Sequence, residues 1–408
     1  MVGRIERLAA GLVLVLLLVA TNAIGNLSTY GSGVLLLLTL PLLLSSPEMR
    51  RRMARSESVA YGAAFLLLAL AFALSADTPS DVAYATNFVW FLMFIPAVAL
   101  LSVHAGPRAT QYFGTLTLIG SAVSAAVGYY EAEILGIGRA VGFANLTNPF
   151  AMAGVMLGFL ALTGFFARKD QWRYLYLLGP IMALGTAVFT GTRGAMVMIA
   201  VLSLAAFGFW VLSFRGRQRL FALLAGLALA GLTVAVGSFS GLQGRALSAF
   251  HAIAAYFGHG EAVDLSTEIR LNFYFGGIQA FLESPIFGHG NGDQFEAARR
   301  FMSQAVNEAM PNTTHLHNDY VNFAALAGVM GLAAYGLYML IPVFGAVRSV
   351  RDSQYMPRLY GAVVVCLCYA TFGLFDTSFA MELLLGFGPI CTAALLGFCV
   401  DAPAPMKE

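Results

Sequence analysis

Charged side chains are scarce in this sequence. Only 11% of its 408 residues are Asp, Glu, Lys or Arg, whereas 59% are hydrophobic. With a mean hydropathy of +0.77, the chain lies outside the range of soluble globular domains. Apolar runs of roughly 20 residues, long enough to cross a hydrocarbon core of about 30 Å, recur along nearly the whole chain. We therefore predict an integral membrane protein.

The apolar runs also lack the alternation of polar and apolar residues that is typical of outer-membrane barrels. The segments LVLVLLLVA and GLALAGLTVAV are apolar on every face, and a helix satisfies its own backbone hydrogen bonds inside a bilayer. The sequence thus predicts an all-α fold, a polytopic bundle of about twelve transmembrane helices. The expected spans are residues 8–24, 33–44, 59–75, 82–103, 110–130, 143–166, 172–190, 194–213, 219–238, 319–346, 359–375 and 381–400.

Cysteine is rare, and its four positions fall in the last two predicted spans. Thiols embedded in lipid usually act as small apolar fillers, so we expect neither a disulfide nor a cysteine-based metal cluster. The N-terminal apolar run has no convincing small-residue cleavage site, and we expect it to remain as the first helix. The tryptophans Trp90, Trp172 and Trp210 are typical of interface or packing positions.

Basic residues are distributed unevenly between the predicted loops. If the N-terminus is cytoplasmic, all but six of the 23 basic residues fall on the cytoplasmic side, as the positive-inside rule requires. Both termini are then cytoplasmic. The basic residues form no stripe suited to nucleic acid, so we expect no nucleic-acid partner. The six exceptions are Arg139, Arg193, Arg245, Arg270, Arg299 and Arg300.

One long segment, residues 239–318, separates the nine helices predicted in residues 1–238 from the three predicted in residues 319–408. In this orientation the segment is periplasmic. Apolar and aromatic residues recur in it at helical spacing after residue 268, and Pro285 with the glycines that follow ends this helix in a tight turn. We expect amphipathic helices that rest on the membrane surface or cap the bundle.

Three blocks of sequence contain the most distinctive motifs. They are TGTRGAMV at 190–197, EIRLNFYFGGIQAFLESPIFGHGNG at 268–292 and HLHNDYVNFAALAGVMGLAAYGLYM at 315–339. In this order they resemble the signature motifs of the O-antigen ligase and O-antigen polymerase superfamily. The resemblance implies transfer of a glycan from an undecaprenyl-pyrophosphate carrier on the periplasmic side of a bacterial inner membrane, without a nucleotide sugar or a metal. It also implies that Arg193, Arg270 and His317, with its neighbour Asn318, are functional residues.

Arginine suits a site that must neutralise the charge developing on a pyrophosphate, because its planar fork binds phosphate oxygens in pairs. Thr192 is a candidate cap for the helix that follows it, and a helix N-terminus supplies N–H groups to an anion. We expect Arg270 in the first turn of its own helix, with Ser266 or Thr267 as the cap. Two arginines and two helix ends would then converge on one pyrophosphate.

The acceptor hydroxyl needs a base, and the ordinary pKa of histidine, near 6.5, suits that role at neutral pH. His317 directly precedes a predicted span, at the outer interface. His315 is two residues away, so both side chains could face one side of an extended segment, and a His-x-His metal pair must be considered. No third ligand is evident beyond Asp319.

Each of these residues also has a structural alternative. Arg193 could reach out to the membrane interface, and Arg270 could pair with Glu268 or Asp264. His317 and the asparagine after it could simply cap the helix that they precede.

Asp376 falls at the outer end of the eleventh predicted span. Carboxylates near membranes are costly and usually paired, so Asp376 could orient His317 or an arginine, or it could cap the turn into the last helix. The predicted catalytic residues are His317, Arg193 and Arg270. The predicted substrate-binding residues are Arg193, Arg270, Asn318, His315, Asp376, Gly288 and Gly290, and weaker candidates are Glu382, Tyr274 and Asp319.

The leading interpretation is an O-antigen ligase that moves a glycan from undecaprenyl pyrophosphate to a sugar hydroxyl of lipid A–core. We expect direct, inverting displacement without a cofactor, because no nucleophile motif accompanies His317. The alternatives within the superfamily are a polymerase, whose acceptor is another lipid-linked repeat unit, and a protein oligosaccharyltransferase. A membrane transporter would favour internal repeats and charged or broken helices at the midplane. Neither is found, and the polar groups gather at one face.

Overall fold

The computed structural model describes residues 2–142, 146–214, 216–220, 265–290 and 292–398. Within these ranges the regular structure consists of helices, and no strand is present. Up to residue 212 the helices are α1 (Val2–Leu18), α2 (Thr21–Ile24), α3 (Asn26–Ser45), α4 (Pro47–Met53), α5 (Ser56–Ser75), α6 (Pro79–Ala83), η1 (Tyr84–Met93), α7 (Phe94–Leu101), η2 (Ser102–His104), α8 (Ala109–Tyr129), η3 (Tyr130–Ile134), α9 (Thr147–Leu160), α10 (Leu162–Ala167), η5 (Gln171–Leu177), α11 (Leu178–Thr190) and α12 (Arg193–Leu212). From residue 265 they are α15 (Leu265–Glu283), α16 (Asp293–Arg299), α17 (Gln304–Ala309), α18 (Asp319–Arg348), α19 (Tyr355–Phe372), η6 (Ser378–Ala380) and α20 (Glu382–Gly397).

Eight helical segments among the described residues are long and apolar enough to cross a membrane. This finding confirms the predicted all-α, polytopic membrane protein. Three further predicted crossings correspond to shorter helices, namely α1, α11 together with η5, and α20. The predicted crossing at 219–238 lies, from residue 221 on, outside the described residues.

The predicted start of the second span, at residue 33, is wrong. Helix α3 already begins at Asn26. Ser28 Oγ donates to the carbonyl of Gly25 at 2.8 Å, and Ser32 Oγ donates to the carbonyl of Ser28 at 2.7 Å. Hydroxyls that bond to carbonyls of the preceding turn fit inside a helix, so these polar residues do not interrupt it. The helix has 20 residues and is long enough to cross.

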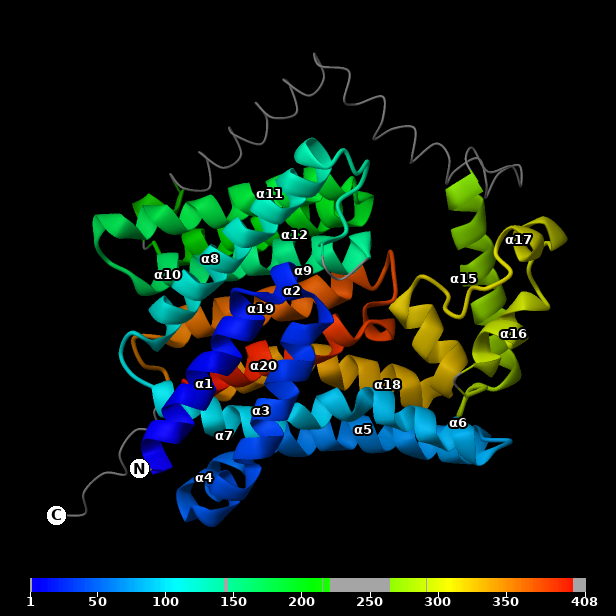
Figure 1. The fold of residues 1–408 in the computed structure, drawn as a ribbon, viewed down its shortest axis with the longest axis horizontal. Coiled ribbons are helices and arrows are strands. Elements are labelled where there is room, and N and C mark those ends of the chain that lie inside the picture. The colour runs from blue at the N-terminus through cyan, green and yellow to red at the C-terminus, as the bar shows by residue number, and fades with distance from the viewer. Residues whose placement is uncertain (1, 143–145, 215, 221–264, 291, 399–408) are drawn as a thin grey trace.

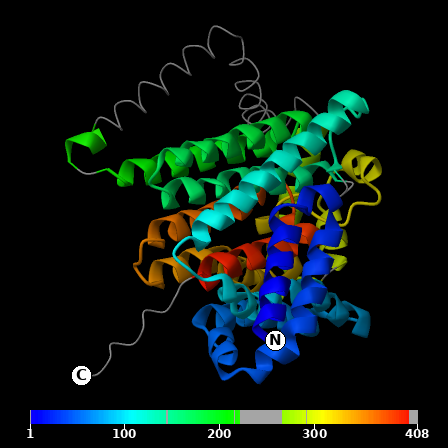
Figure 2. The same cartoon turned by 60° about the vertical axis from the view of Figure 1, so that its left-hand side comes forward.

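Two helices form the centre of the bundle. Every residue of α9 from Pro149 to Leu160 is buried, and so is every residue of α20 from Leu383 to Gly397. Helices α8, α11, α12 and α19 pack against α9, whereas α3, α7 and η1 pack against α20. Figure 2 shows α1 and α3, in blue, along the side of this bundle, where α1 also contacts α8. Leu38, Leu66 and Leu204 are largely exposed on the outer helices, as is usual for side chains that contact lipid.

Helices α15, α16 and α17 form a lobe at one end of the bundle (Figure 1). We call the described residues between 265 and 318 the helical lobe. Its small apolar core contains Phe273, Phe295, Met302 and Leu316, and α15 and α16 pack against α18. The predicted helix after residue 268 is confirmed, since α15 ends at Glu283 before Pro285. The rest of the predicted long segment, residues 239–264, lies outside the described residues.

Helix α18 is interrupted near its beginning, and the second motif block is bound to this interruption. Ala327 and Gly328 have non-helical backbone angles, with φ of 62° at Gly328. The N–H of His289 donates to the carbonyl of Ala325, and the N–H of Gly290 donates to the carbonyl of Leu326, each at 2.9 Å. These two carbonyls would otherwise bond further along the helix. The interruption therefore joins the second and third motif blocks through their backbones.

Gly328 is required at this interruption, and its replacement by alanine should destabilise the fold. A Cβ at this position would lie 2.4 Å from the carbonyl of Ile286, and the positive φ disfavours any L side chain. We expect Gly328→Ala to lose about 2–4 kcal/mol of unfolding free energy. Denaturation of the purified protein in detergent micelles measures this loss.

Gly336→Ala is the matched control, because Gly336 lies in the same helix and an added Cβ meets nothing within 4 Å there. This variant should be unchanged or gain up to about 1 kcal/mol. Equal stability of the two variants would contradict the assigned role of Gly328.

Candidate active site

Four chain segments meet beside the helical lobe. Helices α9, α12 and α18 begin there, and the turn after α19 lies between them. Asn148 comes from the first turn of α9, Arg193 from the first residue of α12, His317 from the residues just before α18, and Asp376 from the turn after α19. Residues far apart in the sequence are thus brought into one polar site at a single end of the bundle.

A hydrogen bond between His317 and Asp376 lies at the centre of the site. His317 Nδ1 is 2.9 Å from Asp376 Oδ1, and Asp376 is almost completely buried. The His317 ring stacks parallel to Phe273 at a centroid distance of 5.9 Å. The Tyr274 hydroxyl donates to the backbone carbonyl of Leu374 at 3.0 Å, and the backbone carbonyl oxygen of His317 lies 3.3 Å from the same hydroxyl. The imidazole is therefore fixed by groups from the lobe and from the turn after α19.

The backbone at His317 has an unusual conformation. Its φ is +48°, and among the described residues no other non-glycine residue has a positive φ. Such conformations occur where the surrounding structure imposes them, often at functional sites. The adjacent Asn318 imposes part of this constraint, since it caps α18 by accepting from the N–H of Val321 at 3.1 Å.

Asp376 is held as a carboxylate by the hydrogen bonds that it accepts. Burial by itself raises the pKa of Asp376, but His317 and then Asn148 and the N–H of Thr377 more than offset it, so the pKa of Asp376 lies below its usual value. Asn148 Nδ2 donates to Oδ2, and the N–H of Thr377 donates to Oδ1 at 2.9 Å. In a neutral His317, an ionised Asp376 favours the tautomer with the proton on Nδ1 and the lone pair on Nε2.

His315 lies beside His317, as predicted from their spacing. Leu316 between them is fully buried in the core of the lobe, so the two histidine side chains extend to the other side of the segment. Their ring centroids are 4.4 Å apart. Burial, followed by the neighbouring His317, lowers the pKa of His315 to about 4. His315 is therefore neutral at physiological pH.

His315, His317 and Asp376 form a group that could hold a metal ion, since their ligand atoms lie within 4.8 Å of one another. The expectation that Asp319 would be the only possible third ligand is wrong. Asp319 is fully buried and accepts from the N–H of Ser378 at 3.1 Å. Ligands at about 2.0–2.1 Å from a tetrahedral ion would lie roughly 3.3 Å apart. The 2.9 Å between His317 and Asp376 fits a direct hydrogen bond better.

Three arginines line a cavity of about 280 Å³ on one side of Asp376. They are Arg139, Arg193 and Arg270. Asp376 is the one carboxylate among the described lining residues, so three positive charges face one negative charge in this part of the lining. Gly191 to Gly194, at the N-terminus of α12, form part of the wall. Backbone N–H groups at a helix start favour an anion in the same way as the guanidinium groups do. The cavity therefore has the charge of an anion-binding site.

Arg139 is positioned by the loop that carries it. Its Nε donates to the carbonyl of Thr190 at 2.9 Å. The N–H groups of Val141 and Gly142, just after it, donate to the Glu131 carboxylate at 2.7 and 2.8 Å. From the sequence, Arg139 is predicted only to be a basic residue outside the cytoplasm, without a role, and Asn148 is not predicted to belong to the site. Its predicted position outside the cytoplasm, which the positive-inside rule disfavours for a basic residue, is the signal that could have identified Arg139.

Some details predicted for the arginines are wrong. Thr192 occupies the N-cap position of α12, but its side chain makes no capping hydrogen bond, and its hydroxyl lies 3.5 Å from Asn148 Oδ1 instead. Arg270 is the sixth described residue of α15, so it does not lie in the first turn, and Ser266 and Thr267 lie inside the helix. Within the described residues, neither predicted arginine forms an ion pair. The proposed pairing of Arg270 with Asp264 concerns a residue outside the described ranges.

Three predicted substrate-binding residues do not line the cavities described here. Asn318 is buried as the cap of α18. Gly288 and Gly290 have φ of 68° and 79°, and a Cβ on Gly288 would lie 2.4 Å from the backbone of Ala327. The structure thus explains these residues by the packing of the lobe on α18. Of the weaker candidates, Tyr274 positions the His317 backbone and Glu382 lines a separate cavity.

Two further cavities lie near the arginine cavity and are linked to it by shared lining residues. Arg139, Asn148 and Asp376 also line a cavity of about 470 Å³ that contains His315 and His317. This middle cavity shares Thr314, His315 and Ala380 with a third cavity of about 550 Å³. The histidines therefore lie between the arginine cavity and the third cavity.

The arginine cavity should bind inorganic pyrophosphate. We expect Arg139→Ala, Arg193→Ala and Arg270→Ala each to weaken pyrophosphate binding by at least about 10-fold, because each removes one charge-assisted contact. Isothermal titration calorimetry of the purified protein measures the dissociation constants. Arg51→Ala is the control, since Arg51 is largely exposed and lies outside the cavity. Equal losses in the control and in the three variants would exclude a specific anion site.

Comparison with known proteins finds a family model that matches the segment forming much of this site. A family model described as O-antigen ligase matches residues 178–336, a range that includes Arg193, Arg270, His315 and His317. A protein of Haemophilus influenzae, described only as uncharacterized, is 26% identical over 193 residues, which are 46% of this chain and 47% of that protein. The aligned region thus spans about half the length of that relative. The family match confirms the predicted resemblance of this chain to the O-antigen ligase and polymerase superfamily of glycosyltransferase-like membrane enzymes.

Proposed function

We propose that this protein is an O-antigen ligase, which transfers a glycan from undecaprenyl pyrophosphate to a sugar hydroxyl of lipid A–core. The observation that carries the proposal is the position of the His317–Asp376 pair next to a cavity lined by three arginines. A base beside an anion-binding cavity is what transfer from a phosphate-activated sugar requires. The family match over residues 178–336 supports the same reaction class.

The arginines act on the donor. Arg139, Arg193 and Arg270 hold the pyrophosphate and neutralise the charge that develops on it as the bond to the anomeric carbon breaks. Arginine remains protonated at any physiological pH, so this assistance does not depend on a proton equilibrium. The N-terminus of α12 adds backbone N–H groups to the same cavity.

His317 acts on the acceptor. Nε2 takes the proton of the attacking hydroxyl while its oxygen forms the new bond to the anomeric carbon and the pyrophosphate leaves with the electrons of the old bond. Asp376 orients the ring and stabilises the imidazolium that results. Asp376 already accepts hydrogen bonds from His317, Asn148 and Thr377, which makes it a poor nucleophile. We therefore propose a single displacement with inversion, and no covalent glycosyl-enzyme.

His317→Ala should abolish ligation, whereas His315→Ala should retain most of it. General-base assistance is typically worth about 10²–10⁴-fold in rate. Among the described residues, the histidine that bonds to Asp376 is His317 and not His315. In a deletion strain, the gene for each variant is tested for restoration of glycan on lipid A–core. We expect the His317→Ala strain to accumulate full-length polymer on undecaprenyl pyrophosphate. Accumulation of single repeat units would instead identify a polymerase.

A chelator tests the metal alternative for the same three side chains. Purified protein should transfer glycan from the lipid-linked donor at the same rate with and without EDTA. If EDTA abolished transfer and zinc restored it, His315, His317 and Asp376 would be metal ligands. Wild-type rates in His317→Ala at normal protein abundance would remove His317 from the mechanism.

We further propose that the protein lies in a bacterial inner membrane with its active site facing the periplasm. Arg52, Arg55 and Arg358 lie at the end of the bundle where α20 finishes, and the His317 site lies at the end where α20 begins. Clusters of basic residues stay on the cytoplasmic side, so this arrangement supports a periplasmic site.

Cysteine labelling tests the orientation. In a background without the native cysteines, an impermeant maleimide added from the periplasm should label Ser303→Cys, in the helical lobe, and not Arg51→Cys. Both positions are exposed in the structure. The reverse pattern would invert the proposed topology.

A further inference from the structure

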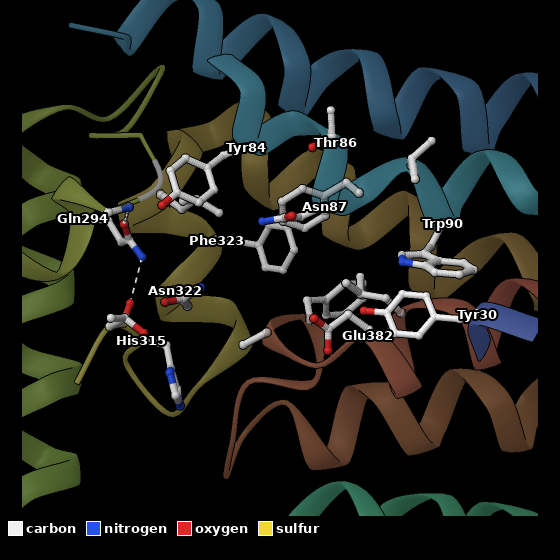
Figure 3. Close-up of a pocket in the computed structure, with 18 residues that line it drawn as sticks. Tyr30, Tyr84, Thr86, Asn87, Trp90, Gln294, His315, Asn322, Phe323 and Glu382 are labelled. Carbon is white, nitrogen blue, oxygen red and sulfur yellow. Dashed lines mark hydrogen bonds between the residues drawn. The ribbon is translucent and has the colours of Figure 1, made fainter. Parts of the chain in front are cut away.

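The third cavity, of about 550 Å³, is not used by the mechanism above. It lies among α3, η1, the beginning of α18 and the beginning of α20. Thr314 and His315 line both this cavity and the middle cavity that contains His317. Figure 3 shows His315 at one side of this cavity and Trp90, Tyr30 and Glu382 at the other. Its volume is within the range of about 300–1,000 Å³ that is usual for sites of small ligands.

Aromatic rings form one part of the wall. The indole of Trp90 lies between two glycines of neighbouring helices, since a Cβ on Gly33 of α3 or on Gly386 of α20 would lie 2.9 or 3.1 Å from it. Tyr30 packs against Trp90 with ring centroids 5.9 Å apart, and Tyr84 lies near the opposite side of the cavity (Figure 3). These contacts agree with the expected packing position of Trp90, and the same side chain also lines the cavity.

Polar groups surround these rings. Thr86, Asn87 and Asn322 line the cavity, and Gln294 fixes the nearby wall by donating to the carbonyl of Thr314 at 3.1 Å. Glu382 is the only charged residue in the described lining, and it lies beside the Tyr30 hydroxyl (Figure 3). Rigid aromatic faces with amide and hydroxyl groups around them suit the apolar C–H faces and the hydroxyl edges of a sugar ring. A lone carboxylate disfavours an anionic ligand.

The direction of displacement gives this cavity a specific role. In an inverting reaction the attacking hydroxyl and the leaving pyrophosphate lie on opposite sides of the anomeric carbon. The arginines place the pyrophosphate on one side of the histidines, so the acceptor must approach from the other side. The third cavity begins on that side, at His315.

We propose that the cavity lined by Trp90, Tyr30, Tyr84 and Glu382 binds the acceptor as an uncharged sugar unit, whose hydroxyl extends past His315 to His317. This inference rests on the proposed transferase function and adds to it the location and the chemical class of the acceptor. The sugar stacks on the aromatic rings. At its hydroxyl edge Glu382 accepts hydrogen bonds, and the Asn87 amide accepts and donates them.

Steady-state kinetics with purified lipid-linked donor and lipid A–core test this assignment. Trp90→Ala and Tyr84→Ala should each raise the KM for the acceptor by about 10-fold and leave the KM for the donor within about 2-fold of wild type. Tyr84 is 41% exposed, so its variant remains informative if the smaller residue at position 90 prevents folding. The control is Tyr112→Ala, a tyrosine that is 61% exposed and lies outside the cavity. A raised donor KM with an unchanged acceptor KM would assign the cavity to the donor glycan and overturn the proposal.

A binding measurement separates this proposal from the transfer reaction itself. Trp172→Phe and Trp210→Phe leave Trp90 as the only tryptophan, and its fluorescence should change on addition of lipid A–core but not of lipid A that lacks the core sugars. An equal response to both lipids, or no response to either, would refute a sugar site. A core-dependent response without any transfer would retain the sugar site and remove the proposed reaction. If transfer required His317 but the acceptor KM were unaltered in Trp90→Ala and Tyr84→Ala, the proposed reaction would stand and the sugar site would be refuted.

Discussion

The hydrogen bond between His317 and Asp376 is the interaction on which the proposed chemistry depends. The two side chains come from segments 59 residues apart, and their meeting requires that α18 begins where α19 ends. Asn148 of α9 and the N–H of Thr377 hold the carboxylate on its other sides. A buried carboxylate with several donors stays ionised, and the histidine beside it keeps one defined tautomer. Segments from α9 and from the turn after α19 thus hold the carboxylate that orients the imidazole ring.

The helical lobe contributes to this orientation through packing. Leu316 is anchored in the lobe core, which turns the two flanking histidines toward the cavities. The interruption of α18 at Gly328 allows the turn after α15 to bond to α18 through backbone groups. The second and third motif blocks are therefore bound to each other by backbone hydrogen bonds. Gly288 and Gly290 are explained by this packing and not by contact with a substrate.

The neighbouring cavities differ in the charge of their described linings. Among the described lining residues, the cavity with Arg139, Arg193 and Arg270 has an excess of positive charge, whereas the cavity with Trp90 contains only the charge of Glu382. In a site partly shielded from water such differences discriminate strongly between ligands. An anionic leaving group and an uncharged sugar would be sorted to opposite sides of His317 by this difference alone.

The sequence by itself determined the membrane class, the all-α fold and most helix positions, because apolar length is a local property. It also singled out Arg193, Arg270 and His317, whose motifs are contiguous. Only the tertiary structure decided that Asp376 is the partner of His317, that Arg139 and Asn148 join the site, and that Asn318 is a helix cap. These roles depend on contacts between residues as far as 228 positions apart, and no local pattern records such a distance. The start of α3 was missed for a related reason, since its hydroxyl groups are satisfied by backbone carbonyls that composition does not reveal.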